Sequence, residues 1–234
     1  MRQALFCVVI AVLIASHAAG AQDDKRGPTP EETLRAYGIN LDPPALIKAL
    51  SNAEPVVREN AAIVLGHRKE RSAVPYLKEA LRDSYSYGRL AAAGALLEMG
   101  DKSAVAELRN MLLQNNDYPA AMKAAEILAV NGIDEGLPVV VQVATTATEA
   151  VDRVQAVRKF SAFARFETQK PLIAKELSNV LRNDSDAIVR RAAASELQDV
   201  RSPEVVQAFR QAATDSDAVV RGLAERYLKN VRQQ

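Results

Sequence analysis

Apolar residues recur along the chain at the spacing of an α-helix, and the same pattern returns about every 31 residues. When Arg58 and its counterparts are aligned, each unit has an alanine three positions later and a large apolar residue seven positions later. The aligned positions are Arg58, Arg89, Ala121, Arg153, Arg190 and Arg221; then Ala61, Ala92, Ala124, Ala156, Ala193 and Ala224; then Leu65, Leu96, Leu128, Phe160, Leu197 and Leu228. Offsets of three and seven share one helical face. The pattern therefore predicts one helix per unit with a buried stripe of small and large residues.

A second apolar stripe precedes each of these helices. Leucines recur four apart at Leu46 and Leu50, Leu77 and Leu81, Leu108 and Leu112, and Leu177 and Leu181. Helix-start signals stand before them, as in Asp42-Pro43, Ser72 with Pro75, Ser103, and Ser202-Pro203. The run Val139–Val143 has strand propensity but occupies a first-helix position, so we expect a helix there. The sequence thus predicts six helix pairs over residues 42–234.

Residues 22–41 form an arm that precedes the repeats and contains one short helix. Thr29-Pro30-Glu31-Glu32 reads as a capping box with proline at the first helical position. These paired acids therefore indicate a helix start and not an acid and base pair for catalysis.

The repeated unit resembles the HEAT repeat, in the short version named after phycobilisome lyases. The resemblance rests on Val-Arg-x-x-Ala-Ala after a polar turn, as in residues 57–62 and 189–194, and it covers about residues 42–230. It implies an all-α fold, a right-handed α-solenoid of about six helix pairs. It also implies that a turn acid bonds the arginine of its own or a neighbouring unit. Asp83, Asp184 and Asp215 lie six residues before Arg89, Arg190 and Arg221, and we expect Asp184 to pair with Arg190.

The third and fourth units depart from this pattern. Ala121 replaces the arginine, and 37 residues separate Arg153 from Arg190. The extra residues fall around Phe160, Phe163 and Phe166, which suggest an extended, bulky helix packed between units. We therefore expect the curvature of the array to change near residues 145–170.

The N-terminus has the order of a secretory signal peptide. Arg2 precedes an apolar run over residues 4–15, and Ala19 and Ala21 fit a cleavage site before Gln22. Residues 1–21 would then be removed, leaving a secreted or periplasmic protein without stable membrane insertion. The alternative is an uncleaved anchor, although the run is short against the roughly 20 residues that span a bilayer.

Composition narrows the chemistry of the remaining chain. Without Arg2, 29 basic residues balance 29 acidic ones, which disfavours nucleic acid as a partner. Cleavage would leave His67 as the single histidine and no cysteine, so histidine-based catalysis and thiolate zinc sites are disfavoured. Asp184-Ser185-Asp186 and Asp215-Ser216-Asp217 read as turns and not as calcium loops. We identify no catalytic residue and expect no cofactor or metal.

In such arrays the second helix of each unit usually lines the concave surface, where partners bind. The solvent-facing positions predicted there are Glu59, Asn60, Ile63, Lys123, Glu126, Gln155, Arg158, Arg191 and Arg226. Tyr85, Tyr87 and Tyr118 form a second patch that could contact a partner or be ordinary half-buried turn residues. These features favour an exported, non-catalytic scaffold or adaptor that binds a protein or peptide. The alternative is a lyase-like or carboxylate-based enzyme acting on a small molecule in the cell envelope.

Overall fold

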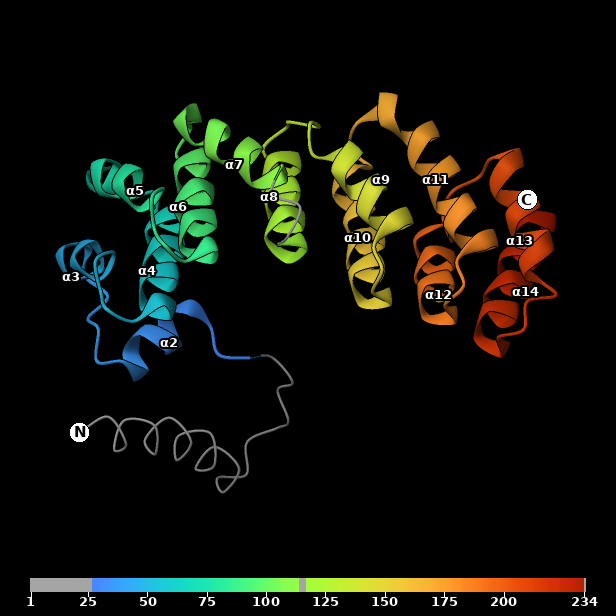
Figure 1. Ribbon diagram of the computed structural model, residues 1–234, viewed down its shortest axis with the longest axis horizontal. Coiled ribbons are helices and arrows are strands. Elements are labelled where there is room, and N and C mark those ends of the chain that lie inside the picture. Colours follow the sequence, from blue (N-terminus) through green and yellow to red (C-terminus); the bar gives the residue numbers. More distant parts are fainter. Residues whose placement is uncertain (1–26, 114–116, 234) are drawn as a thin grey trace, which may run out of the picture.

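The computed structural model describes residues 27–113 and 117–233, and this part of the chain is built from helices without any strand (Figure 1). The expected signal peptide, residues 1–21, lies outside the described residues. The first helix of the described part is α2 (Pro30–Ala36), which lies in the predicted arm. Six helix pairs follow it, as the repeat pattern predicts.

Each pair has a first and a second helix. The first helices are α3 (Pro43–Ala49), α5 (Val74–Ala80), α7 (Val105–Leu112), α9 (Leu137–Thr146), α11 (Lys170–Asn183) and α13 (Pro203–Ala212). The second helices are α4 (Pro55–His67), α6 (Ser86–Glu98), α8 (Tyr118–Val130), α10 (Ala150–Phe163), α12 (Ala187–Glu196) and α14 (Ala218–Arg232). Short 3-10 helices, η1 (Arg71–Ala73), η2 (Lys102–Ala104) and η3 (Glu167–Gln169), lead into α5, α7 and α11. The valine run is helical in α9, so its position in the repeat overrides strand propensity.

The pairs stack into an arc in which the first helices form the outer row and the second helices form the inner row (Figure 1). Consecutive second helices pack on one another throughout the array, whereas α3, α5 and α7 in the outer row make few direct contacts. A row whose members lie close together must be the concave side of the arc. In the outer row, α11 touches α9 and packs on α13, so the packing changes beside residues 145–170, where we expect a change of curvature.

The core consists of the predicted small and large stripe. All six stripe alanines are buried, and so are all the large residues except the last. In α14, Leu228 is only half-buried, and Tyr227 beside it is fully buried. The Tyr227 ring stacks on Phe209 with 3.9 Å between centroids, and its hydroxyl donates to the Val200 carbonyl at 2.7 Å. The final unit therefore closes its core with an aromatic pair.

The helix starts follow the sequence signals in part. The Thr29–Glu32 capping box is formed, and Asp42 and Ser202 accept backbone N–H groups at the starts of α3 and α13. Ser72 and Ser103 do not cap. Their backbone N–H groups instead donate to Glu70 and Asp101, which cap the 3-10 turns ahead of α5 and α7. At both sites the capping residue therefore stands two residues before the serine that the sequence pattern indicates.

Arginine side chains of the first, fourth and fifth units each reach the turn aspartate of the following unit. The carboxylate of Asp83 accepts from Nε and Nη2 of Arg58, both at 2.7 Å. Asp184 accepts from Arg153 at 2.7 and 2.9 Å. The prediction that the Asp184 carboxylate pairs with Arg190 was therefore wrong, because this carboxylate binds Arg153 of the preceding unit.

Arg190 instead holds the next acid along the chain. Its Nε and Nη2 donate to Asp215, both at 2.8 Å, while Nη1 donates to the Asp184 carbonyl at 2.9 Å. Each such arginine thus bonds the turn of its own unit and the acid of the following unit. We call this row of contacts the arginine ladder.

The fourth unit absorbs its extra residues differently from our expectation. Helix α10 has 14 residues and is barely longer than the second helices α4, α6 and α8, which have 13, whereas α11 has 14 against 7 in α5. The extension therefore lies in the first helix of the next pair. Phe160 and Phe163 are buried between units, as expected, and Phe166 packs 6.2 Å from Phe163 between ring centroids.

Candidate functional site

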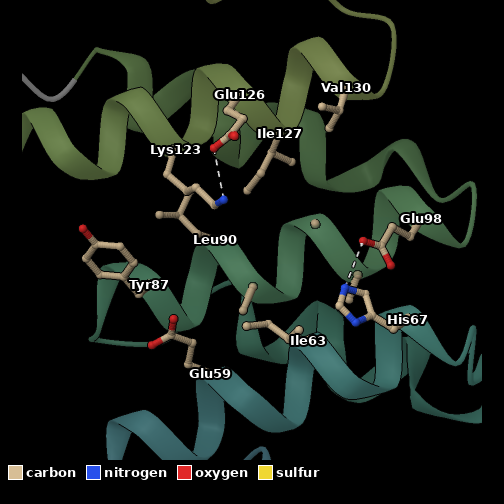
Figure 2. Close-up of a pocket in the computed structure, with 13 residues that line it drawn as sticks. Glu59, Ile63, His67, Tyr87, Leu90, Glu98, Lys123, Glu126, Ile127 and Val130 are labelled. Carbon is tan, nitrogen blue, oxygen red and sulfur yellow. Dashed lines mark hydrogen bonds and ion pairs between the residues drawn. The ribbon is translucent and has the colours of Figure 1, made fainter. Parts of the chain in front are cut away.

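The concave face is hollowed where α4, α6 and α8 lie next to one another. The hollow, which we call the α6 groove, has a volume of about 340 Å³. Its apolar lining is Ile63, Leu90, Ala91, Gly94, Ala95, Ile127 and Val130, and its polar lining is Glu59, His67, Tyr87, Glu98, Lys123 and Glu126. Figure 2 shows these side chains converging on the space from three consecutive second helices. The volume is at the lower end of the range of ligand pockets, about 300–1,000 Å³.

The groove exists because α6 carries its smallest residues at the concave positions. Where α8 has Lys123 and Glu126, the corresponding residues of α6 are Ala91 and Gly94. A Cβ atom added to Gly94 would meet only the Ile127 Cδ1 atom, at 3.9 Å. The floor of the groove is thus a stretch of helix surface that no long side chain covers.

Close packing on one side of α6 leaves the opening on the other. Gly66 of α4 faces Ala95 so closely that an added Cβ would lie 2.7 Å from the Ala95 Cα atom. Helices α4 and α6 pack extensively on one another, while α6 and α8 pack less extensively. The groove follows this wider interval.

Glu59 marks one end of the groove with a carboxylate that has no partner. It is half-buried, and within residues 27–113 and 117–233 it forms neither a hydrogen bond nor an ion pair. Burial raises the pKa of Glu59, and the charge of Lys123 offsets this only in part. The chain therefore leaves this carboxylate partly desolvated, with no hydrogen-bond donor in the described residues and only the nearby charge of Lys123 to compensate.

Two tyrosines lie beside this carboxylate. The rings of Tyr85 and Tyr87 are 5.6 Å apart between centroids, and Tyr87 lines the groove. Burial raises the pKa of both tyrosines; the negative charge of Glu59 raises that of Tyr85 further, and Asp117 and then Glu59 raise that of Tyr87. Figure 2 shows Glu59 projecting from α4 toward Tyr87. This end of the groove is therefore acidic and aromatic.

The other charged groups of the groove are already engaged. Glu126 accepts hydrogen bonds from Lys123 at 3.1 Å and from Lys159 of α10 at 2.8 Å. Burial alone would raise the pKa of Glu126, but these two hydrogen bonds outweigh it and lower the pKa. At the far end, His67 Nε2 lies 3.9 Å from a Glu98 oxygen, and both side chains are largely exposed.

The predicted concave residues divide into three groups. Glu59, Ile63, Lys123 and Glu126 line the groove. Asn60 donates its amide to the Val56 carbonyl at 2.7 Å, within its own helix.

The rest of the predicted residues lie elsewhere on the second helices. Gln155 is half-buried and Arg158 exposed on α10, and Arg226 is exposed on α14, outside the groove. The side chain of Arg191 is 42% exposed, and its guanidinium also forms an ion pair with Asp217, the cap of α14. Its role in the structure is to join two units.

The tyrosine patch is placed in part as expected. Tyr85 is the N-cap residue of α6 and Tyr87 lies in its first turn, while Tyr118 is the first residue of α8 and packs partly against the core.

Sequence reasoning missed the centre of the groove because it sought charged residues. The available signal was the pair Ala91 and Gly94, where neighbouring units carry larger side chains.

The described part of the chain shows no cluster of three or more histidine, cysteine, aspartate or glutamate residues that could hold a metal ion. Within the same residues, no helix combines the length and the apolar character needed to cross a membrane.

Solved structures with the same fold include the YibA protein of Escherichia coli, at 21% identity and a TM-score of 0.56, covering 89% of this chain and 79% of that one. An engineered protein matches at 19% identity and a TM-score of 0.52, over 80% of this chain and 95% of its own. The complex of CpcE and CpcF of phycocyanin lyase from Nostoc matches at 20% identity and a TM-score of 0.42, over 92% of each chain.

Comparison with curated protein sequences gives no match. The family model of HEAT repeats matches residues 43–129 and 174–234, which together make up more than half of the chain. The two matched segments contain every residue of the α6 groove except Val130, and the ladder pairs Arg58–Asp83 and Arg190–Asp215. The chain therefore belongs to the HEAT-repeat family.

Proposed function

We propose that this protein is an exported, non-catalytic scaffold that binds another protein through the concave face of its helix array, with the α6 groove as the main contact. The observation that carries the proposal is the groove itself. It is an open, mainly apolar hollow of about 340 Å³ that three consecutive units build together. Partner surfaces favour such hollows because buried apolar and aromatic contacts contribute most of the binding free energy.

Export belongs to the same proposal. The order of residues 1–26, with one basic residue, an apolar run, small residues and then charges, supports cleavage before Gln22. Protein recovered from an exporting host should then begin at Gln22 and be found in the soluble envelope or medium fraction. Intact Met1 in a membrane fraction would contradict this part of the proposal.

Site-specific photo-cross-linking tests the binding site. Val130 lies on the rim of the groove and is 55% exposed, and Val219 on α14 is 48% exposed and far from the groove in sequence. A photoreactive amino acid at position 130 should capture a defined envelope protein, while the same group at position 219 should not.

Two controls sharpen this experiment. Gly94→Met would fill the floor of the groove and should abolish capture from position 130, whereas Gly222→Met, on the open surface of α14, should leave it unchanged. Equal capture from positions 130 and 219, or capture that survives Gly94→Met, would exclude the α6 groove as the binding site.

A further inference from the structure

The α6 groove carries an excess of acidic groups. Its lining contains three carboxylates, on Glu59, Glu98 and Glu126, against the single ammonium group of Lys123. That ammonium group and the one of Lys159, which lies outside the lining, both bond Glu126, so three carboxylates face two ammonium groups. The groove therefore attracts a cation more strongly than an anion, because complementary charge guides association.

Among these carboxylates, Glu59 is the one to which a ligand can supply the missing hydrogen bonds. Its carboxylate is half-buried beside apolar side chains, and the chain supplies it with no hydrogen-bond donor within the described residues. A partly desolvated carboxylate gains most from a charged donor, because the donor replaces the water that burial has removed. Glu126, by contrast, already accepts from two lysines.

The tyrosine rings beside Glu59 indicate which kind of cation the groove favours. Tyr87 lines the groove and Tyr85 packs against it, 5.6 Å away between ring centroids. A guanidinium group can stack on an aromatic face while it donates two hydrogen bonds to a carboxylate. An ammonium group on a flexible stem cannot do both as well.

We propose that the α6 groove binds a segment of a partner protein in which an arginine stands beside a large apolar side chain. The arginine contacts Glu59 and Tyr87, and the apolar side chain lies over Ala91 and Gly94. This inference rests on the proposed function and names the chemistry of the partner. The geometry that carries it is an unpartnered carboxylate and an aromatic ring at one end of an apolar floor.

The array offers a matched control for the carboxylate. Glu196 on α12 is half-buried like Glu59, burial raises the pKa of its carboxyl group, and a basic residue, Arg158, lies near it. It does not line the groove. Glu196→Gln should therefore reproduce every general effect of Glu59→Gln except the loss of the cation site.

The experiment selects short random peptides on the full-length protein and repeats the selection on Gly94→Met. Peptides that need Gly94 should carry arginine next to a leucine, isoleucine, methionine or aromatic residue. For a selected peptide, Glu59→Gln should weaken binding by about tenfold or more, as loss of a charged contact at a partly buried site does. Glu196→Gln should change its affinity by less than about twofold.

A further control separates a binding role from a structural one. Glu59→Gln removes a partly desolvated charge, so the variant should unfold at the same or a higher temperature while it binds the peptide more weakly. Replacing the arginine of the peptide by glutamine should weaken binding to the wild-type protein and should have little further effect on Glu59→Gln.

Three results would overturn the inference. These are Gly94-dependent peptides that are acidic or uncharged, a complete lack of Gly94-dependent peptides, and unchanged affinity in Glu59→Gln. If position 130 still captures an envelope protein in a Gly94-dependent manner in any of these cases, the scaffold function stands and the arginine site alone falls. If position 130 captures nothing while the peptides bind as expected, the scaffold function falls and the cation site stands.

Discussion

At the scale of single residues, the arginine ladder shows how one side chain can satisfy two units. Nη1 of Arg58, Arg153 and Arg190 donates to a carbonyl six residues earlier, in the turn of the same unit. The remaining donors reach the aspartate of the next unit. The sequence spacing of six therefore identifies a real contact, but with the backbone of the turn and not with its carboxylate. The carboxylate faces the preceding unit, which spacing within one unit could not reveal.

The pair formed by Arg190 and Asp215 should contribute strongly to stability. Both side chains are about 10% exposed, so removing either one leaves a largely buried charge without its partner. Arg190→Ala should lower the free energy of unfolding by about 2–4 kcal/mol. A double-mutant cycle with Asp215→Ala, followed by urea denaturation, should show coupling, whereas a cycle of Arg190→Ala with Asp184→Ala should show less. Equal coupling in both cycles would argue against the assigned pairs.

Tyr85 occupies a position where other units have a capping aspartate. Asp186 and Asp217 accept backbone N–H groups at the starts of α12 and α14, whereas Tyr85 starts α6 without any side-chain cap. The backbone angles at the three positions are nearly the same. Helix α6 therefore lacks a side-chain cap, and the Tyr85 ring lies beside Tyr87 and near Glu59.

This exchange can be measured with two variants that both lose the ring. Tyr85→Ser restores a capping hydroxyl, and Tyr85→Ala does not. The serine variant should be more stable than the alanine variant by about 1 kcal/mol, the usual value of an N-cap. Thermal unfolding followed by circular dichroism gives the difference. Equal stability of the two variants would mean that the start of α6 cannot accept a side-chain cap.

At the scale of helices, two glycines with opposite surroundings explain how the inner row packs. Gly66 permits the close approach of α4 to α6, because its missing Cβ would touch the Ala95 backbone at 2.7 Å. Gly222 of α14 has open space around it. The same residue type is thus required by packing in one helix and costs helix stability in the other.

Alanine substitutions should therefore have opposite signs at these two sites. Gly66→Ala forces α4 and α6 apart and should destabilise the protein by about 1–3 kcal/mol. Gly222→Ala adds no clash and should stabilise it by about 0.4–1 kcal/mol, because alanine restricts the unfolded chain and favours a helix. Denaturant midpoints of the two variants test this. A stabilising Gly66→Ala would show that the contact between the two helices is not tight.

At the scale of the whole molecule, the carboxylates of the ladder make stability depend on pH. Hydrogen bonds from Arg58 and Arg190 lower the pKa of Asp83 and Asp215, and Lys78 lowers that of Asp101 to about 2. A lowered pKa in the folded protein means that the stabilisation is complete above the ordinary value near 3.8 and is lost as pH falls through the folded value.

We therefore expect the free energy of unfolding to fall between about pH 4 and pH 2. Glu59 and Glu196 have the opposite sign, because burial raises their pKa in the folded protein. Their protonation should slightly stabilise the fold as pH falls toward 4.5 from above. Urea denaturation from about pH 6 down to about pH 2 measures both effects. Constant stability down to pH 2 would contradict the role of the ladder aspartates.

Much of this architecture can be predicted from sequence, because the repeat itself supplies the information. The alanine and leucine stripe is local and periodic, so it fixes both rows of helices and even overrides strand propensity in α9. The lengthening of α11 could not be predicted, since the extra residues are equally helical on either side of the turn. The groove was missed for a different reason: it depends on where side chains are absent, at Ala91 and Gly94, and on the wider interval between α6 and α8.

The arginine ladder departs from its usual pattern in the units that form the α6 groove. Arg89 bonds Glu107 of α7, at 3.1 Å, where Arg58, Arg153 and Arg190 hold a turn aspartate, and Ala121 provides no guanidinium at all. Each unit of such an array is stabilised mainly by its neighbours, so a further contact between the second and third units would stabilise both. A ligand lying across α4, α6 and α8 would add such a contact. Occupancy of the groove would then couple the local opening of the first two units to that of the third.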